Sequence, residues 1–101
     1  MTYPVVPTDL SVTRQFLAEN SDLMVVGFRF EATADGKLHY HPHVQSTYVE
    51  VGRFTFTVDD VMHDLGQGDS MVIPSGVRHG CLCTEAGTLI DTFTPCCDNL
   101  L

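Results

Sequence analysis

The chain is short of basic residues and has no tryptophan. Among its 101 residues, 13 are Asp or Glu and only five are Lys or Arg, with Lys37 as the single lysine, and the formal net charge is -8. Such a charge repels nucleic-acid backbones and anionic lipid, so we expect neither nucleic acid nor a membrane as a partner. The acidic balance has two open interpretations, a solubilising surface or an adaptation to high salt.

Long apolar runs are also missing. No stretch approaches the length needed to cross a bilayer, and the first ten residues lack the basic and apolar regions of a secretion signal. We therefore expect a cytoplasmic protein. The four cysteines form a C-x-C and an adjacent pair, neither of which has zinc-knuckle spacing; they are Cys81, Cys83, Cys96 and Cys97. We expect reduced thiols that pack as small apolar side chains.

Glycine, proline and aspartate interrupt the chain at short intervals, and the segments between them are rich in Val, Phe, Thr and Ile, which is typical of an all-β protein. Alternating polarity predicts a strand over Arg53–Asp59 with Phe54, Phe56 and Val58 on its buried face. The other expected strands are Met24–Thr33, Val61–Leu65, Ser70–Pro74, Gly80–Thr84 and Thr88–Thr94. Roughly eight short strands in a chain of this length favour a closed barrel or jelly roll.

Two connecting segments are predicted from local residue types. Val12–Asn20 is expected to form a short helical segment, with Thr8, Asp9 or Ser11 as its cap. A turn at Glu85-Ala86-Gly87 is expected to separate the last two strands.

Polar residues recur at every second position from residue 39. On a regular strand one inner face would carry His39, His41, His43, Gln45, Thr47, Val49 and Val51. Imidazoles at the mouth of an apolar interior are costly without a partner, and a metal ion is a natural one because neutral imidazole is a common metal ligand. From these residues alone, a histidine-rich surface loop is the alternative. His43 follows Pro42, which can break the register, so we expect His43 at the rim.

A second motif supports the metal interpretation. Residues 68–79 have the form G-x5-P-x-G-x2-H and end at His79, while His39-x-His41, Gln45 and Gly52 have the spacing of a first motif. With both motifs in this order the chain resembles the cupin superfamily, except that glutamine replaces the usual glutamate. The resemblance implies one divalent metal ion (Zn, Ni, Fe or Mn) with the ligands His39, His41, Gln45 and His79.

The cupin resemblance also implies the fold and the domain organisation. The expected fold is all-β, a single-domain cupin with a double-stranded β-helix (jelly-roll) barrel. The domain would span residues 1–101, with residues 1–22 as an N-terminal segment and residues 23–95 as the barrel core. A homodimer is expected, because single-domain cupins usually pair through exposed sheet edges.

The last strand carries an acid on an apolar face. Parity places Leu89, Asp91 and Phe93 together, so Asp91 would point into the barrel. Burial raises the pKa of a carboxyl and suits it to proton transfer. The alternative is a structural acid that bonds to backbone or to a ligand histidine.

The string Asp91-Thr92-Phe93-Thr94-Pro95, with the first motif and Tyr48, is similar to the KdgF family. Members of that family convert 4,5-unsaturated monouronates from pectin or alginate breakdown to linear ketonised uronates. The resemblance implies a small sugar acid as substrate, with Asp91 as the catalytic acid and base and Phe93 as the neighbouring aromatic wall.

One departure from the KdgF pattern concerns the substrate carboxylate. The family commonly has an arginine shortly after the Asp91–Pro95 string, where this chain has Cys96-Cys97. Arg78 or Arg29 could substitute, although the parity of Arg78 points away from the ligand side. Two other functions stay open, namely another metal cupin enzyme such as a dioxygenase or isomerase, and a non-catalytic sugar-binding cupin.

Overall fold

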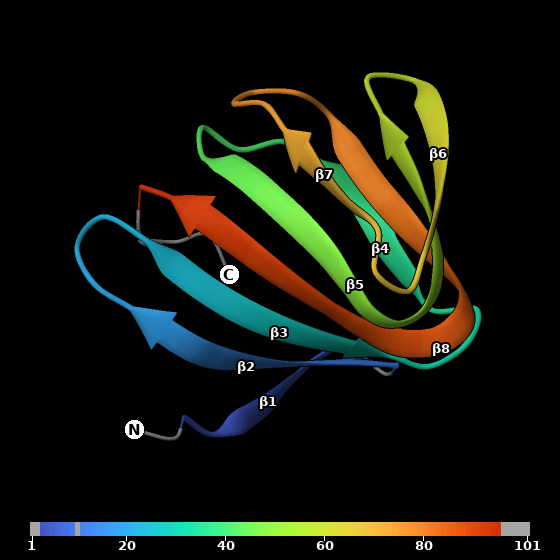
Figure 1. Ribbon diagram of the computed structural model, residues 1–101, viewed down its shortest axis with the longest axis horizontal. Coiled ribbons are helices and arrows are strands. Elements are labelled where there is room, and N and C mark those ends of the chain that lie inside the picture. The colour runs from blue at the N-terminus through green and yellow to red at the C-terminus, as the bar shows by residue number, and fades with distance from the viewer. Residues whose placement is uncertain (1–2, 10, 96–101) are drawn as a thin grey trace.

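The computed structural model describes residues 3–9 and 11–95, which form eight strands (Figure 1). The strands are β1 (Val5–Asp9), β2 (Val12–Glu19), β3 (Met24–Phe30), β4 (Asp35–His39), β5 (Val44–Val58), β6 (Val61–Gly66), β7 (Ser70–Ile73) and β8 (His79–Thr94). The described residues contain no helix that could cross a bilayer. The predicted all-β jelly-roll fold is confirmed.

The architecture depends on the two long strands, β5 and β8, which pair with each other along most of their length. The first half of β5 and the second half of β8 lie in a layer with β1, β2, β3 and β7. Their other halves lie in a layer with β4 and β6. Every pairing is antiparallel. Strand β8 bends at one end of the barrel and thereby belongs to both layers (Figure 1).

The curve in β5 and β8 depends on glycine. The β5–β8 register shifts near Val51 and Arg53, where Gly52 has a φ of 89°. A Cβ atom at Gly87 would lie 1.9 Å from the carbonyl oxygen of Val51, so no larger residue fits this crossing. The two strands therefore bend sharply here without separating.

The core lies between the two layers. Phe30 on β3 and Phe54 on β5 have ring centroids 5.2 Å apart across it, in an edge-to-face arrangement. The larger core cluster also contains Val49, Ile73 and Cys83, which are fully buried. The expected burial of Phe54, Phe56 and Val58 is confirmed.

Two local predictions are wrong. Residues 12–19 form strand β2 between β1 and β3, and Thr8 lies in the β1–β2 hairpin, where its Oγ1 donates to the carbonyl oxygen of Val12. The same residue types occur in hairpin turns and at helix caps, so they do not distinguish the two. Residues 12–19 form a strand because β3 supplies their backbone hydrogen bonds. Residues 85–87 are part of the continuous strand β8, because the glycine crossing replaces a turn.

The inner face predicted for β5 holds only in part. Thr47 and Val49 are fully buried, whereas Val51 is 47% exposed. The register shift after Val49 inserts an extra residue and reverses the facing of the next side chain. The strand is also not continuous from residue 39, because β4 ends at His39 and β5 begins at Val44.

Candidate metal centre

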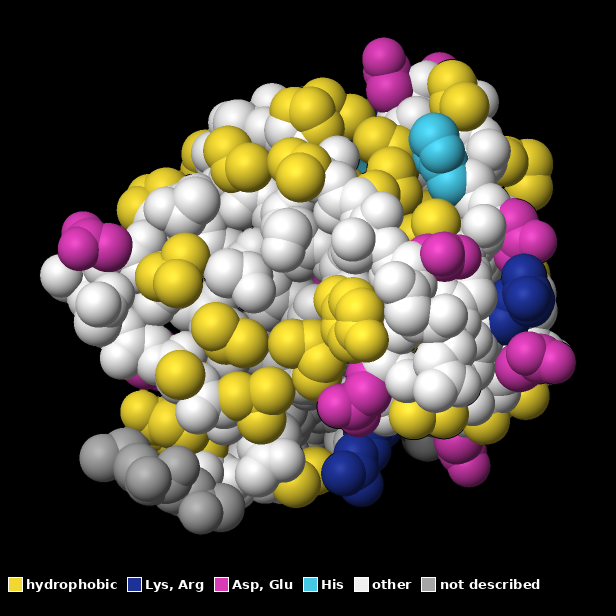
Figure 2. Space-filling view, viewed as in Figure 1, with side chains coloured by type: hydrophobic (Ala, Val, Ile, Leu, Met, Phe, Trp, Pro, Cys, Tyr) yellow, Lys and Arg dark blue, Asp and Glu magenta, His cyan; other side chains and the backbone are white. Residues whose placement is uncertain are grey.

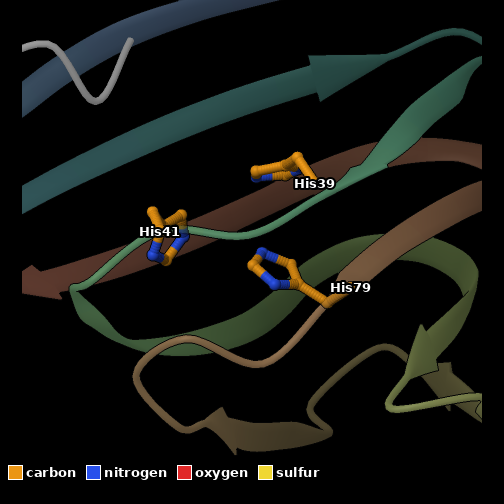
Figure 3. A group of neighbouring side chains, drawn as sticks. All are labelled: His39, His41 and His79. Atoms are coloured by element: carbon orange, nitrogen blue, oxygen red, sulfur yellow. The ribbon is translucent and has the colours of Figure 1, made fainter.

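Three of the predicted metal ligands meet at one end of the barrel. His39 ends β4, His79 begins β8 directly opposite it, and His41 lies in the loop between β4 and β5. One ring nitrogen from each of them lies within 4.8 Å of the others. Figure 3 shows the three rings turned toward one another, with His39 and His41 on one continuous segment and His79 on another.

Backbone contacts hold the His41 loop in place. The backbone N–H of Gly76 donates to the carbonyl oxygen of His41 over 2.8 Å, and the Ser75 hydroxyl donates to that of Pro42 over 2.6 Å. Ser75 and Gly76 belong to the turn of the second motif, which leads to His79. The two motifs are therefore joined through the backbone beside the site.

The same type of hydrogen bond orients all three imidazoles. The Nδ1 atoms of His39, His41 and His79 lie 2.8, 3.1 and 2.9 Å from backbone carbonyl oxygens. A carbonyl oxygen only accepts, so each Nδ1 carries the proton and each Nε2 of a neutral ring presents a lone pair. The Nε2 atom of His79 is buried without a partner. Burial lowers the pKa of His79, with the nearby His39 and His41 adding to the effect, so its neutral form is favoured.

Gln45 completes a donor set that fits a divalent cation. Its amide nitrogen donates to Oδ2 of Asp91 over 3.1 Å, which leaves its Oε1 atom 3.2 Å from Nε2 of His41. With Nδ1 of His41 protonated, two lone pairs face each other across this distance. A cation bound by both atoms removes the conflict and also partners the buried Nε2 of His79. His39, His41, Gln45 and His79 could thus hold a metal ion.

Asp91 lies behind the metal ligands. It is 5% exposed, and its Oδ1 atom accepts a hydrogen bond from the Thr47 hydroxyl over 2.5 Å. The β5–β8 register places Thr47 opposite Asp91 and Gln45 opposite Phe93. Burial raises the pKa of Asp91 to about 7, against the opposing effect of the Thr47 hydrogen bond.

These residues line a cavity of about 370 Å³, which is in the size range of small-molecule sites. Its polar end is formed by His39, His41, Gln45, His79 and Asp91. Its other walls are largely apolar and include Phe28, Phe30, Phe56, Leu89 and Phe93. The ring of Phe93 has its centroid 5.8 Å from that of His41, so this aromatic wall reaches the ligand histidines.

Other residues singled out from the sequence lie apart from this group. His43 is buried with its ring centroid 5.6 Å from that of His41, but it does not line the cavity. Cys81 lines the cavity as a free thiol whose pKa burial raises to about 12, so it stays uncharged. Cys96 and Cys97 lie outside the described residues.

Sequence reasoning missed two residues of the site. Thr47 was expected only as part of the inner face, yet it is the hydrogen-bond donor to Asp91. Lys37 lines the cavity and its carbonyl oxygen accepts the hydrogen bond from Nδ1 of His39. Thr47 lies two residues from Gln45, so strand parity was the available signal for it. Lys37 lies where the β4–β8 register shifts, so parity did not report its place.

Fold and site together define a cupin. The family model of the cupin domain matches residues 28–92, and the chain belongs to this family.

Among solved structures, an RmlC-like cupin from Shewanella frigidimarina NCIMB 400 is 37% identical, with a TM-score of 0.93 over 98% of this chain and 89% of that one. KdgF from Halomonas sp. is 31% identical, with a TM-score of 0.91 over 98% of this chain and 92% of that one. The similarity to KdgF expected from the sequence is thereby confirmed.

A curated relative matches only a part of the chain. Protein SchB from Streptomyces halstedii is 45% identical over 42 residues, which make up 41% of this chain and 30% of that protein. The chain thus matches less than a third of the length of this relative.

Proposed function

We propose that the protein is a metal-dependent enzyme that converts 4,5-unsaturated monouronates to linear ketonised uronates. The observation that carries this proposal is the buried carboxyl of Asp91, which faces the cavity and is hydrogen bonded to the predicted metal ligand Gln45. The likeness to KdgF along nearly the whole of both chains supports the same reaction class. Whether the uronate derives from pectin or alginate does not enter the chemistry.

The reaction needs two proton movements. The substrate is an enol ether, so ring opening breaks the bond between C1 and the ring oxygen while the C1 hydroxyl loses its proton, and the resulting enol gains a proton at C4 to become a ketone. Atoms balance without another reactant, because the product is an isomer of the substrate. A divalent ion held by His39, His41, Gln45 and His79 would supply Lewis acidity toward the substrate oxygens.

The residues of this chain have separate tasks in that reaction. Asp91 receives and returns the proton, and its two oxygens are held by Thr47 and Gln45, which leaves little freedom for rotation. Phe93 and the other aromatic walls offer apolar faces to the C–H surface of a sugar ring. These apolar walls limit access of bulk water to a bound ligand.

The test is turnover of a 4,5-unsaturated monouronate by metal-loaded protein, followed as loss of its ultraviolet absorbance with and without oxygen. We expect Asp91→Asn to lower kcat by about 100-fold or more with unchanged metal content, as for loss of a general acid–base group. Asp60→Asn is the matched control, because Asp60 is exposed and does not line the cavity. Decay at the spontaneous rate with metal bound would refute the proposal, and a strict need for oxygen would point to a dioxygenase.

A further inference from the structure

The basic side chains are placed unevenly with respect to the cavity. All five lie in the described part of the chain; they are Arg14, Arg29, Lys37, Arg53 and Arg78. Arg53 is paired with Asp64 at 3.1 Å and with Glu85 at 3.8 Å. Arg14 and Arg29 line a separate depression on the outer surface. Basic residues are also sparse among acidic ones on the face shown in Figure 2.

Arg78 does not reach the cavity either, although it precedes the predicted ligand His79. Its side chain is exposed and is absent from the cavity wall. Lys37 is therefore the only lysine or arginine that lines the cavity. Within the part of the chain that the structure describes, Lys37 has no ion-pair partner, so its charge is available to a ligand.

Lys37 lies at the entrance of the cavity. It lies on β4 between Asp35 and His39, all three of which line the cavity. The hydrogen bond from His39 Nδ1 to the Lys37 carbonyl oxygen, at 2.8 Å, fixes the backbone of residue 37 relative to the predicted metal ligand. The ammonium group sits on a flexible four-carbon stem, which lets it reach over the entrance.

We propose that Lys37 binds the carboxylate of the substrate and makes the site selective for anionic sugars. This inference rests on the proposed function, because it takes the substrate to be a uronate. A chain with a formal net charge of -8, with the exposed Asp35 in its cavity wall, repels anions from the entrance. Lys37 counters that repulsion at the place where the ligand enters, and it acts as a specificity-determining residue that moves no proton.

The test compares Lys37→Met with Lys37→Arg in the metal-loaded protein, with Arg78→Met as the matched loss of a basic residue outside the cavity. For the unsaturated monouronate we expect Lys37→Met to raise KM roughly fivefold, the range of an exposed ion pair, with kcat nearly unchanged. Lys37→Arg should restore most of the loss, and Arg78→Met should leave KM as in wild type. Added salt should raise KM in the wild type more than in Lys37→Met.

A binding measurement separates this inference from the proposed function. Calorimetry with galacturonate and its neutral methyl ester should show that the wild type prefers the acid and that this preference is roughly fivefold smaller in Lys37→Met. If the wild type shows this preference through Lys37 but does not turn over the unsaturated uronate, the proposed reaction fails while the anion site stands. If the wild type turns over and Lys37→Met has an unchanged KM and the same preference for the acid, the role of Lys37 is refuted.

Discussion

The buried carboxyl of Asp91 should make the stability of the metal-free protein depend on pH. Its pKa is 3.8 for an ordinary exposed side chain and about 7 in the folded chain. The folded state therefore holds this proton more tightly than the unfolded state. The stability linked to this proton is complete below pH 3.8 and is lost as the pH rises to about 7.

The size of the effect follows from the two pKa values. A pKa of 3.8 in the unfolded state and about 7 in the folded state changes the free energy of unfolding by about 4 kcal/mol over the whole titration. About 3 kcal/mol of this change falls between pH 5 and pH 8. Asp91 is only 5% exposed, so screening by solvent is small. A domain of this size has a total stability of about 5–15 kcal/mol, which makes the loss easy to measure.

The assay is urea denaturation of wild type and Asp91→Asn from pH 5 to pH 8 with a chelator present. Relative to Asp91→Asn, the wild type should lose about 3 kcal/mol over this range. The lowered pKa of His79 has the opposite sign, because its contribution is present above pH 6.5 and is lost on acidification, but it occurs in both proteins. If the difference between the two proteins stays constant with pH, Asp91 titrates like an exposed carboxyl and the reasoning is refuted.

Three further predictions concern the surroundings of the site. Thr47→Val should destabilise the metal-free protein by about 1.5–3 kcal/mol at pH 8, where Asp91 is ionised. Thr47→Ser keeps the hydrogen bond and is the control. Equal urea midpoints for Thr47→Val and Thr47→Ser would contradict this prediction. Gly87→Ala should cost at least about 3 kcal/mol in thermal melts because its Cβ would meet the Val51 carbonyl, whereas Gly68→Ala, in open space at φ 90°, should cost about 1 kcal/mol. Removal of the bound metal ion by a chelator should lower Tm but leave the far-ultraviolet circular dichroism spectrum unchanged. In His79→Ala the chelator should no longer shift Tm. Loss of the β spectrum on chelation would contradict this prediction, because it would show that folding requires the metal.

The parts of the site that the sequence predicts are those that depend on short-range spacing. His39 and His41 stand two apart, and the Pro-Gly turn before His79 is a local feature. That His79 joins the other two was implied by the cupin resemblance, and in the structure the pairing of β4 with β8 brings the three together. Parity also predicts the inward direction of Asp91 and Phe93, since the end of β8 is regular.

Long-range pairing accounts for what the sequence does not predict. Val51 is exposed because β5 shifts its register against β8, which depends on the close approach of a glycine 36 positions later in the chain. Residues 12–19 form a strand because β3 is available as a partner, and no local propensity reports that. The hydrogen bond from Thr47 to Asp91 and the access of Lys37 to the cavity likewise arise only when distant strands are placed side by side.

The placement of the site on the sheets divides it into two halves of different local stability. Gln45, Thr47 and Asp91 belong to β5 and β8, where they are flanked on both sides by paired strands, so their amides should exchange with solvent only on global unfolding. His39 and Lys37 belong to β4, which pairs with β8 alone among the described strands. Local fraying of β4 from β8 requires far less free energy than global unfolding. The acid–base group Asp91 is thus anchored in the part of the fold that opens last, whereas the predicted metal ligand His39 and the entrance lie at an edge that can open first.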